Sequence, residues 1–244
     1  LPAAPANGAV VASSFMLYPS EATGTTVTSY RFRLLTANQQ VACHGCWPKS
    51  ITLTGVDGKS TPIVTITWGV TWWAHVAATF PSAATKQTFT PAPCAGGSFH
   101  MSITGTATRT TYNVRDLAIT IDLGIVSQDT TGGATQYATT TGAIRTKHMA
   151  ILSGVVNADA ASTTPTWETF FESPGTTRLV VLTANGAATG KRWAFVMPAA
   201  KLVGDKAMQI ENGGVNSNRF ALQSCTGPTT TTPLTQSAYR IAQG

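Results

Sequence analysis

The sequence predicts a mainly β fold arranged as two tandem domains with one short α-helix. Short apolar runs alternate with turns rich in Gly, Thr and Asn, a pattern typical of β-strands. A group of three such runs occurs twice, and this duplication favours two small domains over one large one. We therefore predict a first domain at residues 1–110 and a second at residues 111–244.

The two copies share the order of their strands and turns. Residues 34–38 (LLTAN) correspond to residues 181–185 (VLTAN), and the Trp-Pro pair at 47–48 corresponds to the Met-Pro pair at 197–198. The first copy lacks the strand pair that precedes the second. The chain begins without Met, so its N-terminus is either processed or preceded by further residues, and the missing strand pair favours residues upstream of Leu1.

Residues 164–172 (TPTWETFFE) carry the signals of a helix start. Thr164 can serve as the N-cap, Pro165 fits the first helical position, and Glu168 places a carboxylate near the positive end of the helix dipole. Three aromatic residues follow one stripe of the helix: Trp167, Phe170 and Phe171. We expect this stripe to dock on a sheet.

The longest alternating run lies at residues 112–125. One face carries apolar residues, namely Val114, Leu117, Ile119, Ile121 and Leu123. The opposite face is small, polar and acidic, with Asp116, Ala118, Thr120 and Asp122. The expected hairpin partner at residues 143–155 carries Arg145 and Lys147, spaced to meet those aspartates across the strands. Residues 63–70 also alternate, as half-buried strands do.

The second copy, together with the segment that leads into it, resembles the tail tube (major tail) proteins of long, flexible-tailed bacteriophages, the siphophage type. The shared pattern is a strand pair with a long loop, a short helix, two strands ending near a proline, and a last strand after a Gly-rich turn. It covers residues 112–224 and, more loosely, residues 29–75.

This resemblance implies two β-sandwich or barrel-like tube domains in one chain. Such chains would close trimeric, pseudo-hexameric rings, which stack into a channel for DNA ejection in the virion tail after assembly in the host cytoplasm. The implied partners are other copies of the chain, the tape-measure protein, tail terminator and tip proteins, and DNA that passes without specific binding. Neither a cofactor nor a membrane is implied.

The resemblance also suggests roles for particular residues. The polar strand face would line the channel through Asp116, Thr120 and Asp122, with Arg145 and Lys147 offset by the carboxylates or turned toward a neighbour. The loop at residues 127–141 would reach toward the next ring through Gln128, Asp129, Gly132, Gly133, Gln136 and Tyr137.

Composition is consistent with a subunit covered by partners. Charged residues make up 11% of the chain, far below the roughly 25% of ordinary soluble domains. The formal net charge of +6 is spread without a run of Lys or Arg, so the basic balance is weak support for nucleic-acid binding. No apolar run approaches the roughly 18 residues of a membrane-spanning helix.

Four cysteines allow several disulfide pairings: Cys43, Cys46, Cys94 and Cys225. The Cys-His-Gly-Cys turn at residues 43–46 could supply half of a zinc site or a redox pair. However, neither a second CxxC nor a pair of histidines at ligand spacing follows it. A structural disulfide or buried thiols are therefore the preferred interpretation.

Three tryptophans, Trp68, Trp72 and Trp73, offer an alternative function. They could form a glycan platform on a secreted or cell-surface β-sandwich module. Packing between sheets or subunits is the preferred interpretation, because aromatic side chains dominate buried contacts. A third hypothesis also places the chain in a phage tail, but as a tail terminator or a decoration protein.

The sequence lacks a recognisable catalytic or metal-binding pattern. The acidic residues and the four histidines (His44, His75, His100 and His148) are dispersed, and there is no GxSxG nucleophile turn. The paired glycines at 132–133 and 213–214 lack the Lys and helix start of a phosphate-binding loop. We therefore expect a protein that is not an enzyme.

Overall fold

A computed structural model describes the following residues of the chain: 16–19, 27–36, 39–56, 62–77, 97–103, 109–130, 139–146, 148–157, 175–184, 193–203, 208–210, 216–225 and 237–243. The secondary structure assigned in this part of the chain is almost entirely antiparallel β-strand, which confirms the predicted mainly β fold. The predicted helix at residues 164–172 lies outside the described residues.

The strands, in chain order, are β1 (Met16–Pro19), β2 (Tyr30–Thr36), β3 (Gln39–Thr54), β4 (Ile63–Ala77), β5 (Ser98–Ile103), β6 (Thr110–Tyr112), β7 (Val114–Asp122), β8 (Ile125–Thr130), β9 (Thr139–Arg145), β10 (Met149–Asn157), β11 (Arg178–Ala184), β12 (Trp193–Leu202), β13 (Met208–Ile210), β14 (Asn216–Ser224) and β15 (Arg240–Gln243). Thirteen of them form one sheet with the path β2-β3-β7-β10-β14-β12-β11-β5-β6. The short β1, β13 and β15 strands add to its edges, β4 pairs with β3, and β8 and β9 form a separate two-stranded sheet.

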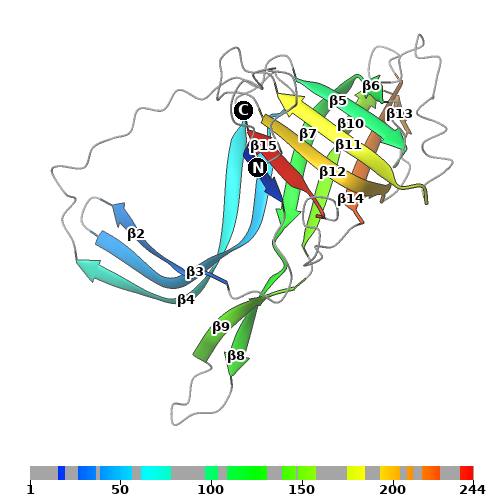
Figure 1. Cartoon of the computed structure of the whole chain (residues 1–244). Coiled ribbons are helices and arrows are strands. Elements are labelled where there is room, and N and C mark those ends of the chain that lie inside the picture. The colour runs from blue at the N-terminus through cyan, green and yellow to red at the C-terminus, as the bar shows by residue number, and fades with distance from the viewer. Residues whose placement is uncertain are drawn as a thin grey trace, which may run out of the picture.

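The large sheet folds back on itself into two layers, which we call the body (Figure 1). One layer contains β5, β11 and the first part of β12, and it lies across β7, β10 and β14. Strand β12 passes from one layer to the other, because Trp193 to Ala200 pair with β11 and Ala200 to Leu202 pair with β14.

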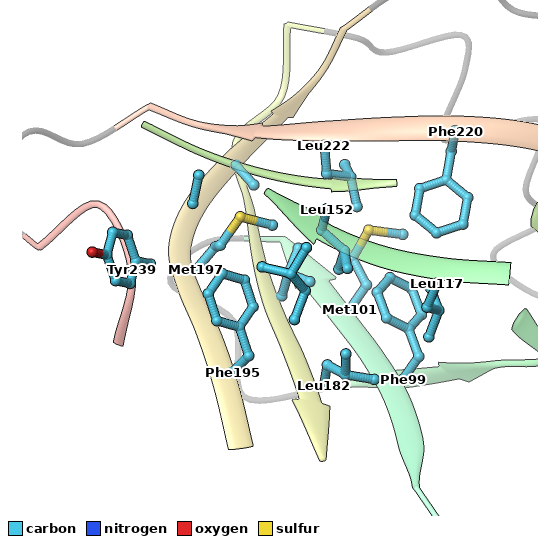
Figure 2. Close-up of a cluster of buried hydrophobic side chains, with 14 of the residues drawn as sticks. Phe99, Met101, Leu117, Leu152, Leu182, Phe195, Met197, Phe220, Leu222 and Tyr239 are labelled. Atoms are coloured by element: carbon cyan, nitrogen blue, oxygen red, sulfur yellow. The ribbon is translucent and has the colours of Figure 1, made fainter. Parts of the chain in front are cut away.

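The hydrophobic core lies between these layers (Figure 2). Phe99 on β5 packs against Phe220 on β14, with ring centroids 5.6 Å apart, so side chains from the two layers meet directly. Leu152 on β10 and Leu222 on β14 are completely buried. The alternation predicted for β7 is confirmed, because Leu117, Ile119 and Ile121 are buried while Asp116 and Asp122 are exposed.

Two extensions leave the body (Figure 1). The first, which we call the arm, consists of β2, β3 and β4. Strand β3 joins the arm to the body, because its residues Ser50 to Thr54 pair with β7 while its first half pairs with β2. The second, which we call the hairpin, consists of β8 and β9. The segment expected to be a loop at residues 127–141 is therefore partly strand, since β8 extends to Thr130 and β9 begins at Thr139.

The strands of both sequence copies pair antiparallel in chain order. The first group is β2-β3-β4, and the second is β11-β12-β14, where the short β13 precedes β14 in the chain and pairs with it. Strand pairing also crosses the predicted boundary at residues 110 and 111, because β3 pairs with β7 and β5 pairs with β11. The division into two tandem domains stays a prediction.

Candidate assembly surfaces

A polar face runs across the body and onto the arm. Matched positions on adjacent strands form a row that contains Thr65 (β4), Thr52 (β3), Thr120 (β7), Ile151 (β10), Gln223 (β14) and Lys201 (β12). The next row contains Thr67, Ser50, Asp122 and Met149. The face is thus rich in hydroxyl groups, and in these two rows it carries one lysine and one aspartate. Two of the predicted channel residues, Thr120 and Asp122, belong to it.

Asp122 has a structural role where β7 ends and the hairpin begins. Its Oδ1 accepts a hydrogen bond of 2.8 Å from the backbone N–H of Gly124, which has a positive φ of 59°. The carbonyl oxygen of Gly124 accepts hydrogen bonds from both the backbone N–H and the hydroxyl of Thr146, at 2.7 and 2.6 Å. These contacts fasten the base of the hairpin and redirect the chain away from the body.

Asp116 lies at an irregularity in β7. Its φ is 54°, in the left-handed region where Asp is one of the better tolerated non-glycine residues, and the register with β10 shifts nearby. Its Oδ2 lies 3.7 Å from Nη1 of Arg115. The Asp116 side chain is 66% exposed and that of Arg115 is 24% exposed, so water screens this contact and it contributes roughly 0–1 kcal/mol. Asp116 therefore stands apart from the regular polar rows that contain Thr120 and Asp122.

The predicted contact between Arg145 and the aspartates of β7 is wrong. Arg145 lies on β9 opposite Ile125 of β8, whereas the strand that pairs with β7 begins at Met149. The charge of Arg145 acts on the phenol of Tyr239 instead. Burial raises the pKa of Tyr239 to about 12, and Arg145 partly opposes that increase. Burial also lowers the pKa of Arg145 itself. Lys147 lies outside the described residues.

The hairpin presents an apolar pair of residues to solvent. Val126 on β8 and Ile144 on β9 are direct cross-strand partners and are 52% and 43% exposed. Gln128 and Asp129 lie farther along β8. The other residues predicted to contact a neighbouring ring lie outside the described part of the chain: Gly132, Gly133, Gln136 and Tyr137. Because an isolated two-stranded hairpin is only marginally stable in water, the exposed pair favours contact with a partner.

The three tryptophans of β4 contact different aromatic partners. Trp68 packs edge-on against Phe32 with a centroid distance of 4.4 Å and also contacts Tyr30. The ring of Trp72 lies 5.0 Å from that of His44, and the ring of Trp73 lies 5.2 Å from that of His75. These contacts do not gather the three indoles into one platform. Trp72 and Trp73 are nevertheless 56% and 59% exposed.

The described cysteines carry free thiols. Cys46 is buried, Cys43 is partly buried and Cys225 is exposed, while Cys94 lies outside the described residues. Burial, together with the proximity of Cys43, raises the pKa of the Cys46 thiol, so this group stays protonated near neutral pH. Within the described ranges, no three His, Cys, Asp or Glu side chains are placed to hold a metal ion.

Among the described residues, the exposed large hydrophobic side chains lie on the arm and the hairpin. In the part of the chain that the structure describes, they are Tyr30, Leu34, Ile63, Val64, Ile66, Val70, Trp72, Trp73, Val126 and Ile144. Six of these ten lie on β4, where the alternating sequence predicts a half-buried strand. Sequence reasoning missed this surface because an apolar residue that faces a partner and one that faces the core give the same pattern.

The described residues contain no helix that is both long and apolar enough to cross a membrane.

A scan against protein-family models finds none that matches, and a search of curated proteins finds no matching sequence.

Proposed function

We propose that this protein is a structural subunit of a bacteriophage tail tube. Copies of the chain would close into rings, and the rings would stack around a channel through which DNA leaves the virion. The observation that carries the proposal is that every described large hydrophobic residue with high exposure lies on the arm or the hairpin. A subunit whose body is covered and whose extensions are apolar is suited to repeated contact with its neighbours.

The polar face supports the assignment of a channel lining. A passing DNA molecule is slowed by every phosphate that Lys or Arg holds, because each such contact releases counterions and adds affinity. The two central rows of the face consist mainly of Thr, Ser and Gln side chains, with Lys201 and Asp122 of opposite charge. We assign this face, including Thr120 and Asp122, to the lumen. Asp116 and Arg145 are left out of this lining, because Asp116 stands apart from the polar rows and Arg145 lies on the hairpin. Lys147 lies outside the described residues.

The repeated group of three paired strands supports the proposed symmetry. If each copy belongs to one tube domain, three chains supply six domains, and the ring is a trimer with pseudo-hexameric symmetry. The resemblance to tail tube proteins also underlies the finer architecture that we propose. It consists of two β-sandwich or barrel-like tube domains and a helix at residues 164–172. The tape-measure protein, the tail terminator and the tail tip proteins are its proposed partners in the virion.

Electron microscopy tests this function directly. We would image the purified chain in negative stain over a range of concentrations and measure the mass of its assemblies by mass photometry. Hollow tubes, or rings of three chains, are the expected result. A monomer at every concentration would contradict the proposal. A variant that lacks the hairpin residues 127–141 is expected to form rings that fail to stack, and normal tubes from it would refute the role of the hairpin between rings.

A second candidate function is glycan binding by a secreted or surface β-sandwich module. The exposed indoles of Trp72 and Trp73 favour it, because exposed aromatic rings can stack on sugars. A glycan array with the Trp72→Ala variant as control tests this function. Specific sugar binding that is lost in the variant would favour the binding module over the tube.

A further inference from the structure

The first part of β4 extends the sheet of the body beyond the layer that covers it. One row of matched residues runs from Leu152 through Ile119 and Leu53 to Val64. Leu152 and Ile119 are buried at 0% and 2% exposure, Leu53 is partly buried, and Val64 is 58% exposed. The apolar face that forms the core therefore continues onto β4, where no other described strand covers it.

The adjacent row shows the same progression. It runs from Ala150 through Ile121 and Ile51 to Ile66. Ala150 and Ile121 are buried, whereas Ile66 is 41% exposed. In two successive rows, the residues on β7 and β10 are thus buried and the residue on β4 is exposed. The exposure of Val64 and Ile66 is a property of this edge of the sheet rather than of one misplaced side chain.

The same part of β4 has an open backbone edge. Strand β4 pairs with β3 and forms no other pairing among the described strands. All five residues at 63–67 are exposed. Natural proteins usually protect such an edge with Lys, Pro, a bulge or a very short strand. Residues 63–67 (IVTIT) contain neither Lys nor Pro, their register with β3 is regular, and β4 is 15 residues long.

We propose that residues 63–67 of β4, which we call the seam, are the site at which a second copy of this chain adds an edge strand. The added strand would continue the sheet by backbone hydrogen bonds, and side chains of the second copy would cover Val64 and Ile66. This inference rests on the proposed assembly into rings and deepens it by naming the strand that carries the contact.

The chemistry of the seam favours another copy over a different partner. The seam carries no charge, so it lacks the cations that would attract a nucleic acid. One side of the seam carries Val64 and Ile66, and the other carries Thr65 and Thr67 together with Ile63 at its first position. The sheet of the body has the same two sides, so a copy that extends it places apolar residues beside apolar residues and threonines beside threonines.

The available area is also adequate. The six exposed hydrophobic residues of β4 (Ile63, Val64, Ile66, Val70, Trp72 and Trp73) offer on the order of 400 Å² of apolar surface. This is about half of the roughly 800 Å² that each partner buries in a standard interface, and interfaces are a little more than half apolar. A partner that follows β4 from the seam toward the tryptophans therefore covers enough surface for a stable contact.

Two charge variants test the seam in the full chain. Val64→Lys and Ile66→Lys place a cation on the apolar side of β4, where the free subunit tolerates it because both positions are exposed. Thr54→Lys is the matched control, since it adds the same charge on an exposed residue of the neighbouring strand β3. We expect the seam variants to lower the assembled fraction at a fixed concentration roughly tenfold or more by mass photometry, and the control to leave it unchanged. Circular dichroism confirms that each variant is folded.

Hydrogen exchange gives a second measurement. Amides at residues 63–67 are expected to become protected when the wild-type chain assembles. Tubes that form normally in both seam variants, with rapid exchange at these amides, would overturn the seam and leave the proposed function standing. Small oligomers that need the seam but never form rings or tubes would support the seam and contradict the tube. A wild-type chain that stays monomeric at every concentration would overturn both.

Discussion

The indole ring of Trp47 packs directly on Gly69, the residue opposite it on the neighbouring strand. A Cβ atom at Gly69 would lie 2.5 Å from Cε2 and Nε1 of that ring. Trp47 is 4% exposed although it lies in the arm. The arm therefore has a small packed centre of its own, and that centre depends on a residue without a side chain.

Replacement of Gly69 tests this contact. We expect Gly69→Ala to lower the free energy of unfolding by about 1–3 kcal/mol, because the added methyl group must displace the buried indole. Gly175→Ala is the control, since a Cβ there meets no atom within 4 Å. Urea unfolding followed by tryptophan fluorescence measures both variants. Equal stability of the two would show that the ring of Trp47 moves aside without cost.

Asp122 is expected to stabilise the start of the hairpin. Asp122→Ala removes the acceptor for the N–H of Gly124 and should lower the free energy of unfolding by roughly 1 kcal/mol. Asp122→Asn keeps an oxygen at the same place and should recover most of that loss. Thermal unfolding of the two variants separates the hydrogen bond from the charge. A loss of the same size in both would assign the effect to the charge.

Alkaline pH should destabilise the body through Tyr239. Its folded-state pKa of about 12 lies above the ordinary value of 10 because burial disfavours the phenolate. From pH 10 to pH 12 the unfolded chain releases a proton that the folded chain retains, so the free energy of unfolding falls as pH rises. The full loss in the free energy of unfolding is roughly 2–3 kcal/mol, and this loss is absent below pH 10. Urea unfolding between pH 8 and pH 11 should show a shallower decline for Tyr239→Phe. If the free energy of unfolding of Tyr239→Phe declined with pH as steeply as that of the wild type, the result would argue against a buried phenol at Tyr239.

The thiols should differ in their rates of alkylation. Among the three described cysteines, we expect iodoacetamide to modify Cys225 first and Cys46 last, because Cys46 is buried and its pKa is raised. Mass spectrometry of peptides after timed labelling measures the two rates, and labelling in urea gives the reference for an unfolded chain. Rapid modification of Cys46 in the folded protein would show that the arm opens.

The sequence predicted those features that depend on local alternation. The two faces of β7 could be assigned because Leu117, Ile119 and Ile121 alternate with polar residues in one strand. The position of Arg145 could not be predicted, because the turn at Gly124 and Thr146 directs β8 and β9 into a separate hairpin. A charge pattern across two expected strands does not reveal that such a turn has intervened.

Exposure was harder to predict than strand identity. Residues 63–70 were correctly expected to form a strand, but Val64 and Ile66 are exposed because the covering layer ends before β4. Alternation shows that one side of a strand is apolar and does not show whether this chain or another covers it. The polar face and the seam could therefore be recognised only when the strand order placed their residues in rows.

The strand order also implies a sequence of folding events. The arm is built from neighbouring strands, whereas β5 joins β11 through Ser98 and Thr183, which are 85 positions apart. Contacts between distant positions form slowly, because a long loop must close before they contribute. The arm can therefore form while the body is still open, and its free edge is then presented to other chains before folding is complete. Newly made subunits would be most prone to premature association in that interval, so the yield of refolded protein should fall steeply as its concentration rises.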